Sequence, residues 1–332
     1  MVYWAQPQKN SVKKMPDILG IDTSNYTTSV ALFKNGRMFQ SKKLLPVAAG
    51  AKGLRQSDAV FHHVQQLPEV LESLPFQGAE IAAVGVSSRP RSMVGSYMPC
   101  FLVGIAVAAA VAKSCSVPLY RFSHQQGHIA AVLYSAGKLE LLRNRFLAFH
   151  VSGGTTEAVL CEPAQDGIFS TRIVAKSLDL KAGQAVDRVG IMLGLHFPAG
   201  PELEKLALRS KKSFQISPVL KGCDCSLSGV ENQCHAMLIA TAAMLKAGAP
   251  EEEIAAYCLS SILAALDGMA AELQKVYGNL PLLFAGGVMG NSILRNALSK
   301  KYKAIFAEPK LSSDNAAGVA VLAALREGNE EL

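Results

Sequence analysis

Two histidines placed four residues apart carry the clearest chemical signal in this chain. His124 and His128 fall within residues 123–134, where Ser123 and the following Gln126 predict a helix that begins with a capping box. Residues i and i+4 lie on one face of a helix, so both imidazoles can reach the same metal ion. The alternative, in which the pair only packs or lies at the surface, stays open on spacing alone.

A metal held by two histidines needs a further ligand, preferably a carboxylate. Asp314 is the best candidate by residue type, because it stands after a short strand at the Ser-Ser-Asp-Asn cap that opens a predicted terminal helix at 312–325. A plain N-cap role fits Asp314 equally well, and a cap leaves one carboxylate oxygen free for a metal.

A repeated segment predicts the elements that position these residues. The segment ILGIDTSNYTTSVALF at 18–33 returns as FLAFHVSGGTTEAVLC at 146–161, at a constant offset of 146 − 18 = 128. Ser24 aligns with Ser152, and Thr27-Thr28 align with Thr155-Thr156. Each copy predicts two strands joined by a polar turn, whose N–H groups and hydroxyls suit phosphate oxygens. Two copies predict two similar lobes with a ligand between their turns.

A third turn has the same character. Ala285-Gly286-Gly287 follow a predicted buried strand at 282–284, and a helix begins near Asn291. Glycines at that point let a nucleoside or phosphate approach the main chain, although a plain tight turn is the alternative. Asn291 either caps the helix or contacts the ligand.

The remaining elements predict an α/β fold. Strands are expected at 81–88, 118–120 and 305–306, and helices at 57–74, 99–112, 178–194, 201–209, 251–276 and 291–300. Hairpins followed by strand–helix alternation, given twice, indicate a duplicated architecture. We expect a flexible arm at 1–16, a first lobe at 17–140 on which a C-terminal helix at 315–332 packs back, and a second lobe at 141–314.

Composition limits the classes of function. The chain has 332 residues, of which 50% are hydrophobic and 18% charged, enough for two lobes. Seven cysteines, without a secretion signal, predict reduced thiols and a cytoplasmic protein. No apolar stretch resembles a spanning helix, so no membrane partner is expected. The net charge of +7 permits a nucleic acid as partner without requiring it.

Taken together, the motifs resemble the tRNA adenosine threonylcarbamoyltransferase family, also called the O-sialoglycoprotein endopeptidase or glycoprotease family. The resemblance covers residues 18–324. It rests on ILGIDTS at 18–24, SHQQGH at 123–128, SGGTTE at 152–157, DLKAGQAVDR at 179–188, PAGP at 198–201, DCSLSG at 224–229, AGGVMGNSILR at 285–295 and SSDNAA at 312–317.

The resemblance implies a fold of duplicated actin/sugar-kinase/Hsp70-like lobes, of the ribonuclease H-like type, with a central cleft. It implies one divalent metal, iron or zinc, held by His124, His128 and Asp314, with a threonylcarbamoyl-adenylate as ligand. The residues implied to bind the adenylate nucleotide are Ser24, Ser152, Gly153, Gly154, Thr155, Gly183, Asp187, Gly286, Gly287 and Asn291. The implied activity is acyl transfer to the exocyclic amine of a tRNA adenosine. The implied partners are other proteins of the threonylcarbamoyl pathway.

Several positions depart from the family pattern. Its acidic pair after the first hairpin strand is Tyr26-Thr27, so no catalytic residue is assigned there. Its glycine-proline-glycine loop is Arg89-Pro90-Arg91, and the glutamate between its histidines is Gln126. These changes are expected to make the cleft more positive and to favour an anionic ligand.

Three functions follow from these patterns. The first is threonylcarbamoyl transfer to tRNA. The second is a divergent paralogue that binds nucleotide and metal without transfer activity. The third is a metallopeptidase, which the missing base at Gln126 disfavours.

Overall fold

The computed structural model describes residues 17–24, 26–35, 37–46, 54–77, 80–165, 168–243, 251–306 and 315–328. The predicted arm at 1–16 and the candidate ligand Asp314 lie outside these residues. The predicted limits of the two lobes therefore stay a prediction.

The first sheet contains five strands in the order β3-β2-β1-β4-β5. Its hairpin strands are β1 (Asp17–Ser24) and β2 (Thr27–Lys34), followed by β3 (Arg37–Leu44). The strands β4 (Ile81–Arg89) and β5 (Leu119–Ser123) continue the sheet in parallel with β1. Strands β1 and β2 are buried on both faces, which explains why they read as nearly continuous apolar runs.

The second sheet repeats this topology. Its order is β12-β11-β6-β7-β8, in which β7 (Thr156–Pro163) is antiparallel to both of its neighbours, β6 (Phe146–Val151) and β8 (Phe169–Lys176). Strands β11 (Leu282–Ala285) and β12 (Ile305–Phe306) are parallel to β6. The hairpin registers also agree, since Ile18 pairs with Phe33 and Phe146 pairs with Cys161. The predicted duplication is confirmed.

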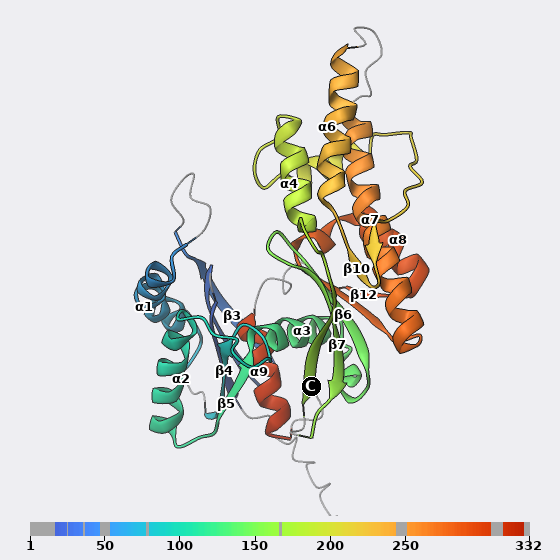
Figure 1. Ribbon diagram of the computed structural model, residues 1–332. Helices are drawn as coiled ribbons and strands as arrows, with labels where there is room; N and C mark the ends of the chain where they lie inside the picture. Colours follow the sequence, from blue (N-terminus) through green and yellow to red (C-terminus); the bar gives the residue numbers. More distant parts are fainter. Residues whose placement is uncertain are drawn as a thin grey trace, which may run out of the picture.

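Helices surround both sheets and join them (Figure 1). The first half carries α1 (Gln56–Glu72) and α2 (Phe101–Cys115). The second carries α4 (Ala182–Met192), α5 (Gly200–Ala207), α6 (Ser228–Ala243), α7 (Glu251–Tyr277) and α8 (Ser292–Tyr302), together with a small β9 (Leu220–Lys221) and β10 (Asp224–Cys225) ribbon. Two short 3₁₀ turns occur at Leu139–Arg143 and Gly287–Gly290.

The two halves share one hydrophobic core. Helices α3 (His124–Ser135) and α9 (Asn315–Arg326) lie between the sheets, and α9 packs directly on β1 and β4. Ile18 of the first sheet, Val159 of the second and Val319 of α9 belong to the same buried cluster. Helices α3 and α9 contact each other most closely at two glycines, because a Cβ on Gly318 would overlap the carbonyl oxygen of Gly127.

Sequence patterns missed β3, β8 and α6, and they began α4 too early. Residues 178–181 are not helical, because the Asp179 carboxylate accepts hydrogen bonds from Leu180 N and, across the fold, from Leu227 N and Ser228 Oγ. A side chain engaged with a distant segment holds its own backbone out of the helix.

One described helix, α7, is long and apolar enough to cross a bilayer by length and composition, which the sequence reading did not anticipate. More than half of its apolar window (56%) is buried inside the fold. Ile262, Met269 and Leu273 of α7 pack in the core beneath the second sheet.

Candidate functional site

Two adjoining cavities contain most of the residues that the sequence nominated. The larger, of about 440 Å³, is lined by Gly153, Gly183, Val186, Asp187, Pro198, Gly200, Pro201, Glu204, Leu259, Gly287, Val288, Gly290 and Asn291. The smaller, of about 280 Å³, is lined by Asp22, Ser24, Tyr26, Thr27, Ser29, His124, His128, His150, Ser152, Gly286, Gly287 and Asn315. Gly287 lines both cavities, and Ser152 and Gly153 of one turn line one each, so the cavities meet at the glycine-containing turns.

The two predicted histidines lie together in the smaller cavity. Their ring centroids are 4.5 Å apart, as expected for positions i and i+4 of α3. The capping box that begins α3 is confirmed, with the Ser123 side chain accepting from Gln126 N and the Gln126 side chain accepting from Ser123 N. Gln126 therefore caps its own helix and does not line either cavity.

Asp22, at the end of β1, orients the first histidine. Asp22 Oδ2 lies 2.8 Å from His124 Nδ1, and the carboxyl group is almost fully buried. Burial alone would raise the pKa of Asp22, but the charge and hydrogen bond of His124 hold it below its ordinary value. A carboxylate on one imidazole nitrogen fixes the tautomer, which is the usual outer-shell arrangement around a metal-binding histidine. The other nitrogen, Nε2, lies 2.9 Å from the amide nitrogen of Asn315, which a bound metal would displace.

A third histidine lines this cavity and was missed from the sequence. The His150 ring centroid lies 5.2 Å from that of His128. The signal that could have found it is the repeat itself, because the 128-residue offset aligns His150 with Asp22 (22 + 128 = 150). Equivalent positions on the two hairpins thus face one cavity.

Burial keeps the second and third histidines neutral at neutral pH. It lowers the pKa of His150 to about 4, with smaller contributions from His124 and Arg91. It also lowers the pKa of His128 well below the ordinary value, helped by the two neighbouring histidines. Neutral imidazoles are the protonation state that binds metals.

Two of the three side chains that the sequence implies as metal ligands, His124 and His128, lie in the described part of the chain, and imidazole is a donor that iron and zinc accept. His124 has a carboxylate on its Nδ1, and His128 makes no hydrogen bond with the part of the chain that the structure describes. The amide nitrogen of Asn315 lies 2.9 Å from His124 Nε2, and its Oδ1 is buried without a hydrogen-bond partner in that part of the chain. Among the described residues, however, no three His, Cys, Asp or Glu side chains are placed so as to hold one ion.

The predicted phosphate turns are open where a ligand would approach. A Cβ placed on Gly153, Gly154 or Gly287 would meet nothing within 4 Å. Gly286 has φ of +100°, and a Cβ there would overlap the Val151 carbonyl, so this position requires glycine. The Ser152 turn closes on itself through Ser152 N to Thr155 O (2.7 Å) and Thr155 N to Ser152 Oγ (3.1 Å).

Gly183 has a different role from the other glycines. A Cβ added to Gly183 would lie 2.6 Å from Gly153 N, and the Gly183 N–H donates to Ser152 O. Gly183 therefore lets the beginning of α4 pack against the Ser152 turn. Gly154 and Thr155, which the sequence also nominated, line neither cavity.

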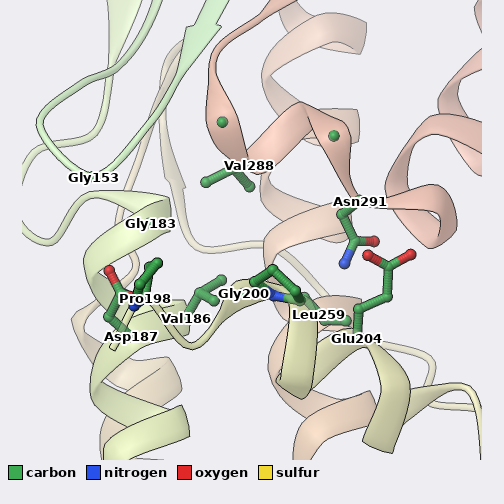
Figure 2. Close-up of a pocket in the computed structure, with 13 residues that line it drawn as sticks. Gly153, Gly183, Val186, Asp187, Pro198, Gly200, Glu204, Leu259, Val288 and Asn291 are labelled. Carbon is green, nitrogen blue, oxygen red and sulfur yellow. The ribbon is translucent and has the colours of Figure 1, made fainter. Parts of the chain in front are cut away.

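Polar side chains stand at opposite sides of the larger cavity (Figure 2). Asp187 is on one side, where its Oδ1 accepts from Ala199 N at 3.0 Å. Asn291 and Glu204 are on the other. Asn291 caps α8 by accepting from Ile293 N and Leu294 N, which confirms one of its two predicted roles.

Glu204 is a cavity residue that sequence reasoning missed. Its Oε1 accepts from Ser292 N (2.7 Å) and Ser292 Oγ (2.5 Å), so it joins α5 to the beginning of α8. Its only sequence signal was its place one turn after the Pro198–Pro201 motif.

The two arginines that were expected to add positive charge to the cleft line neither of the two cavities. Arg91 pairs with the buried Glu157 at 2.8 Å, and Arg89 donates to Ser88 Oγ. The Arg91 charge nevertheless helps to lower the pKa of His150, and the described residues that line these two cavities include no lysine or arginine.

Two sheets of identical topology, with a cavity at their paired hairpin turns, define an actin-like ATPase fold. Solved structures agree: full-length HypF in its phosphate- and nucleotide-bound form matches with a TM-score of 0.59 at 14% identity, over 96% of this chain and 56% of that one. Component A of (R)-2-hydroxyglutaryl-CoA dehydratase from Acidaminococcus fermentans matches with a TM-score of 0.52 at 15% identity, over 94% and 99%.

Comparison of the amino-acid sequence with known families identifies the family of this chain. The model of the tRNA N6-adenosine threonylcarbamoyltransferase family, TsaD, matches residues 50–321, and the chain belongs to this family. Relatives of that name are 30% identical in Halalkalibacterium halodurans, over 93% of this chain and 90% of theirs, and 29% identical in Staphylococcus aureus strain bovine RF122, over 92% and 89%.

Proposed function

We propose that this chain transfers the threonylcarbamoyl group of threonylcarbamoyl-adenylate to the exocyclic N6 amine of an adenosine in tRNA. Family membership supports the activity. The structural observation that carries the proposal is the pair of adjoining cavities, one with histidines and one with nucleoside-type polar groups, that meet at Gly287.

The larger cavity is assigned to the adenosine of the adenylate. Asp187 offers a carboxylate to ribose hydroxyls, while Val186 and Leu259 supply apolar walls for the base. The N–H groups and open space at Gly153 and Gly287 then receive the phosphate.

The smaller cavity is assigned to the acyl group. His124 and His128 would hold the metal, with Asp314 as the ligand that the sequence suggests, and a bound metal would polarise the carbamoyl carbonyl or neutralise the leaving phosphate. The bond from the adenosine N6 to the carbamoyl carbon forms, the bond from that carbon to the phosphate oxygen breaks, and AMP leaves. The N6 proton passes to solvent.

No carboxylate is free to serve as base in the smaller cavity of the described chain. Asp22 is its only carboxylate, and it is engaged with His124. Rate enhancement is therefore assigned to holding the two reactants in line. The metal is iron or zinc by its donors, the tRNA is the acceptor in the cytoplasm, and proteins of the threonylcarbamoyl pathway are the expected partners.

The transfer is tested directly. The purified chain is incubated with threonylcarbamoyl-adenylate and unmodified tRNA, and the digested nucleosides are analysed by mass spectrometry. We expect threonylcarbamoyladenosine with the wild type and at least a roughly hundredfold loss with His124→Ala or His128→Ala, because each removes a proposed ligand. His235→Ala, which replaces an exposed histidine on α6, is the matched control.

The same preparations are analysed for bound metal and for adenylate binding by calorimetry. Adenylate binding without product would contradict transfer and indicate a binding paralogue. Equal metal content in the wild type, His124→Ala and His128→Ala would contradict the assigned ligands.

A further inference from the structure

A buried histidine outside the cavities is hydrogen-bonded to the hairpin that lines them. His63 lies on the inner face of α1 and is completely buried. Its Nε2 is 2.8 Å from the carbonyl oxygen of Ser24, and its Nδ1 is 2.8 Å from Thr28 Oγ1. A carbonyl only accepts, so Nε2 carries the hydrogen and donates to Ser24.

This contact continues to the candidate metal ligand. Ser24 N donates to Asp22 Oδ1 at 3.1 Å, and Asp22 Oδ2 lies 2.8 Å from His124 Nδ1. Four groups are thus joined in series: the ring of His63, the peptide groups of Ser24, the carboxylate of Asp22 and the ring of His124. Asp22, Ser24 and His124 line the smaller cavity, whereas His63 does not.

A helix that packs on a sheet usually buries apolar side chains, whereas α1 buries His63 and a second polar side chain. Gln66, one turn further along α1, is also buried and lies 3.0 Å from Thr28 Oγ1 through its Oε1, while its amide donates to Leu44 O. Burying two polar side chains where apolar residues would pack costs free energy, which their hydrogen bonds offset in part. The single hydroxyl hydrogen of Thr28 is shared between two acceptors, His63 Nδ1 and Gln66 Oε1. Both side chains bond the ends of the strands that form the cavity wall.

We propose that His63 is a positioning residue, which holds the Ser24 end of β1 so that Asp22 keeps the His124 imidazole in its metal-binding orientation. The inference rests on the proposed function, in which His124 binds the metal. Outer-shell partners of this kind change metal affinity about 10- to 100-fold, and His63 is more remote, so the lower end of that range applies.

Two substitutions separate positioning from packing. His63→Gln places an amide N–H where Nε2 was and can still donate to Ser24 O. His63→Asn places its polar group where Nδ1 was and keeps only the Thr28 contact. His63→Asn removes one methylene more than His63→Gln, so it is expected to cost more stability by packing alone. A purely structural role therefore predicts that Co²⁺ affinity falls only in proportion to the loss of unfolding free energy in each variant.

The probe is Co²⁺ added to the metal-free protein and followed by its visible absorption, with urea unfolding of each variant as a measure of folding. We expect wild-type affinity, within about threefold, for His63→Gln and a loss of about tenfold for His63→Asn. His124→Ala should abolish the absorption band, and Gln65→Ala on the exposed face of α1 should not change it.

Equal Co²⁺ affinities for His63→Asn and the wild type would overturn the inference, as would equal losses in the two His63 variants. A wild type whose Co²⁺ binding does not depend on His124 would instead overturn the proposed metal site, and the inference with it. A second readout needs no metal: ¹⁵N shifts of the His124 ring should report one tautomer in the wild type and in His63→Gln, and a mixture in His63→Asn.

Discussion

At the scale of single residues, the site combines a few buried titratable groups whose neighbours fix their charge. Asp22 stays ionised because His124 bonds it, and His128 and His150 stay neutral because they are buried. The result is a carboxylate behind the first imidazole and uncharged imidazoles beside it, which is the state that accepts a cation.

The buried histidines predict how stability depends on pH. The pKa of His150 is about 4 in the folded chain against an ordinary value of 6.5, so the unfolded chain binds this proton first as pH falls. The contribution of the neutral His150 to the unfolding free energy is therefore fully present above about pH 6.5, and it is lost as the pH falls from about 6.5 to 4. The loss from this residue is at most about 3–4 kcal/mol.

Urea unfolding of the metal-free protein at pH 7, 6 and 5 measures this effect. His150→Gln should lose less stability than the wild type over that range, whereas His235→Gln, which alters an exposed histidine, should follow the wild type. An identical pH dependence for His150→Gln and the wild type would show that His150 is not neutral by burial.

At the scale of elements, two helices from distant parts of the sequence are packed closely enough to build the cavity. Helix α3 supplies His124 and His128, and α9 begins at Asn315, which contacts His124. Gly127 and Gly318 permit this approach because neither has a side chain.

Gly318→Ala should therefore damage both folding and metal binding. The new methyl group meets the Gly127 carbonyl, which cannot move without moving α3, and we expect a loss of about 2–3 kcal/mol in unfolding free energy. Metal content should fall in parallel. Gly229→Ala, in a helix where a Cβ meets nothing within 4 Å, is the control and should be neutral or slightly stabilising. Unchanged stability of Gly318→Ala would mean that the helices are not in close contact.

At the scale of the whole molecule, an ion pair with hydrogen-bonded neighbours joins the two halves beside the site. Arg91 follows β4 in the first half, and Glu157 belongs to β7 in the second. Gln125 of α3 also donates to Glu157, at 2.9 Å, and accepts from Thr171. The halves are thus tied by polar contacts as well as by their common core.

Arg91→Ala should lower the unfolding free energy by about 1–2 kcal/mol, because it removes the cation that is paired with the buried Glu157 carboxylate. The estimate is below that for a fully buried pair, since the Arg91 side chain is 40% exposed. Adding Glu157→Gln should recover at least half of the loss, as measured by urea unfolding. A double variant no more stable than Arg91→Ala would contradict an electrostatic tie.

The sequence by itself determined the duplicated hairpins, their register, the capping box of α3 and the residues of the turns. These features are local: strand periodicity, caps and glycine turns depend on residues a few positions apart. The repeat added one long-range fact, since equal segments fold to equal registers.

Only the tertiary structure decided which polar groups meet. The pairing of Arg91 with Glu157, the place of Glu204 beside Asn291, and the series from His63 to His124 join residues 66, 87 and 61 positions apart. Such pairs leave no periodic signal in one sequence, because packing of helices on sheets sets the distances between them. For the same physical reason, the sequence did not reveal that Arg91 pairs with Glu157, or that Arg89 and Arg91 line neither of the two cavities.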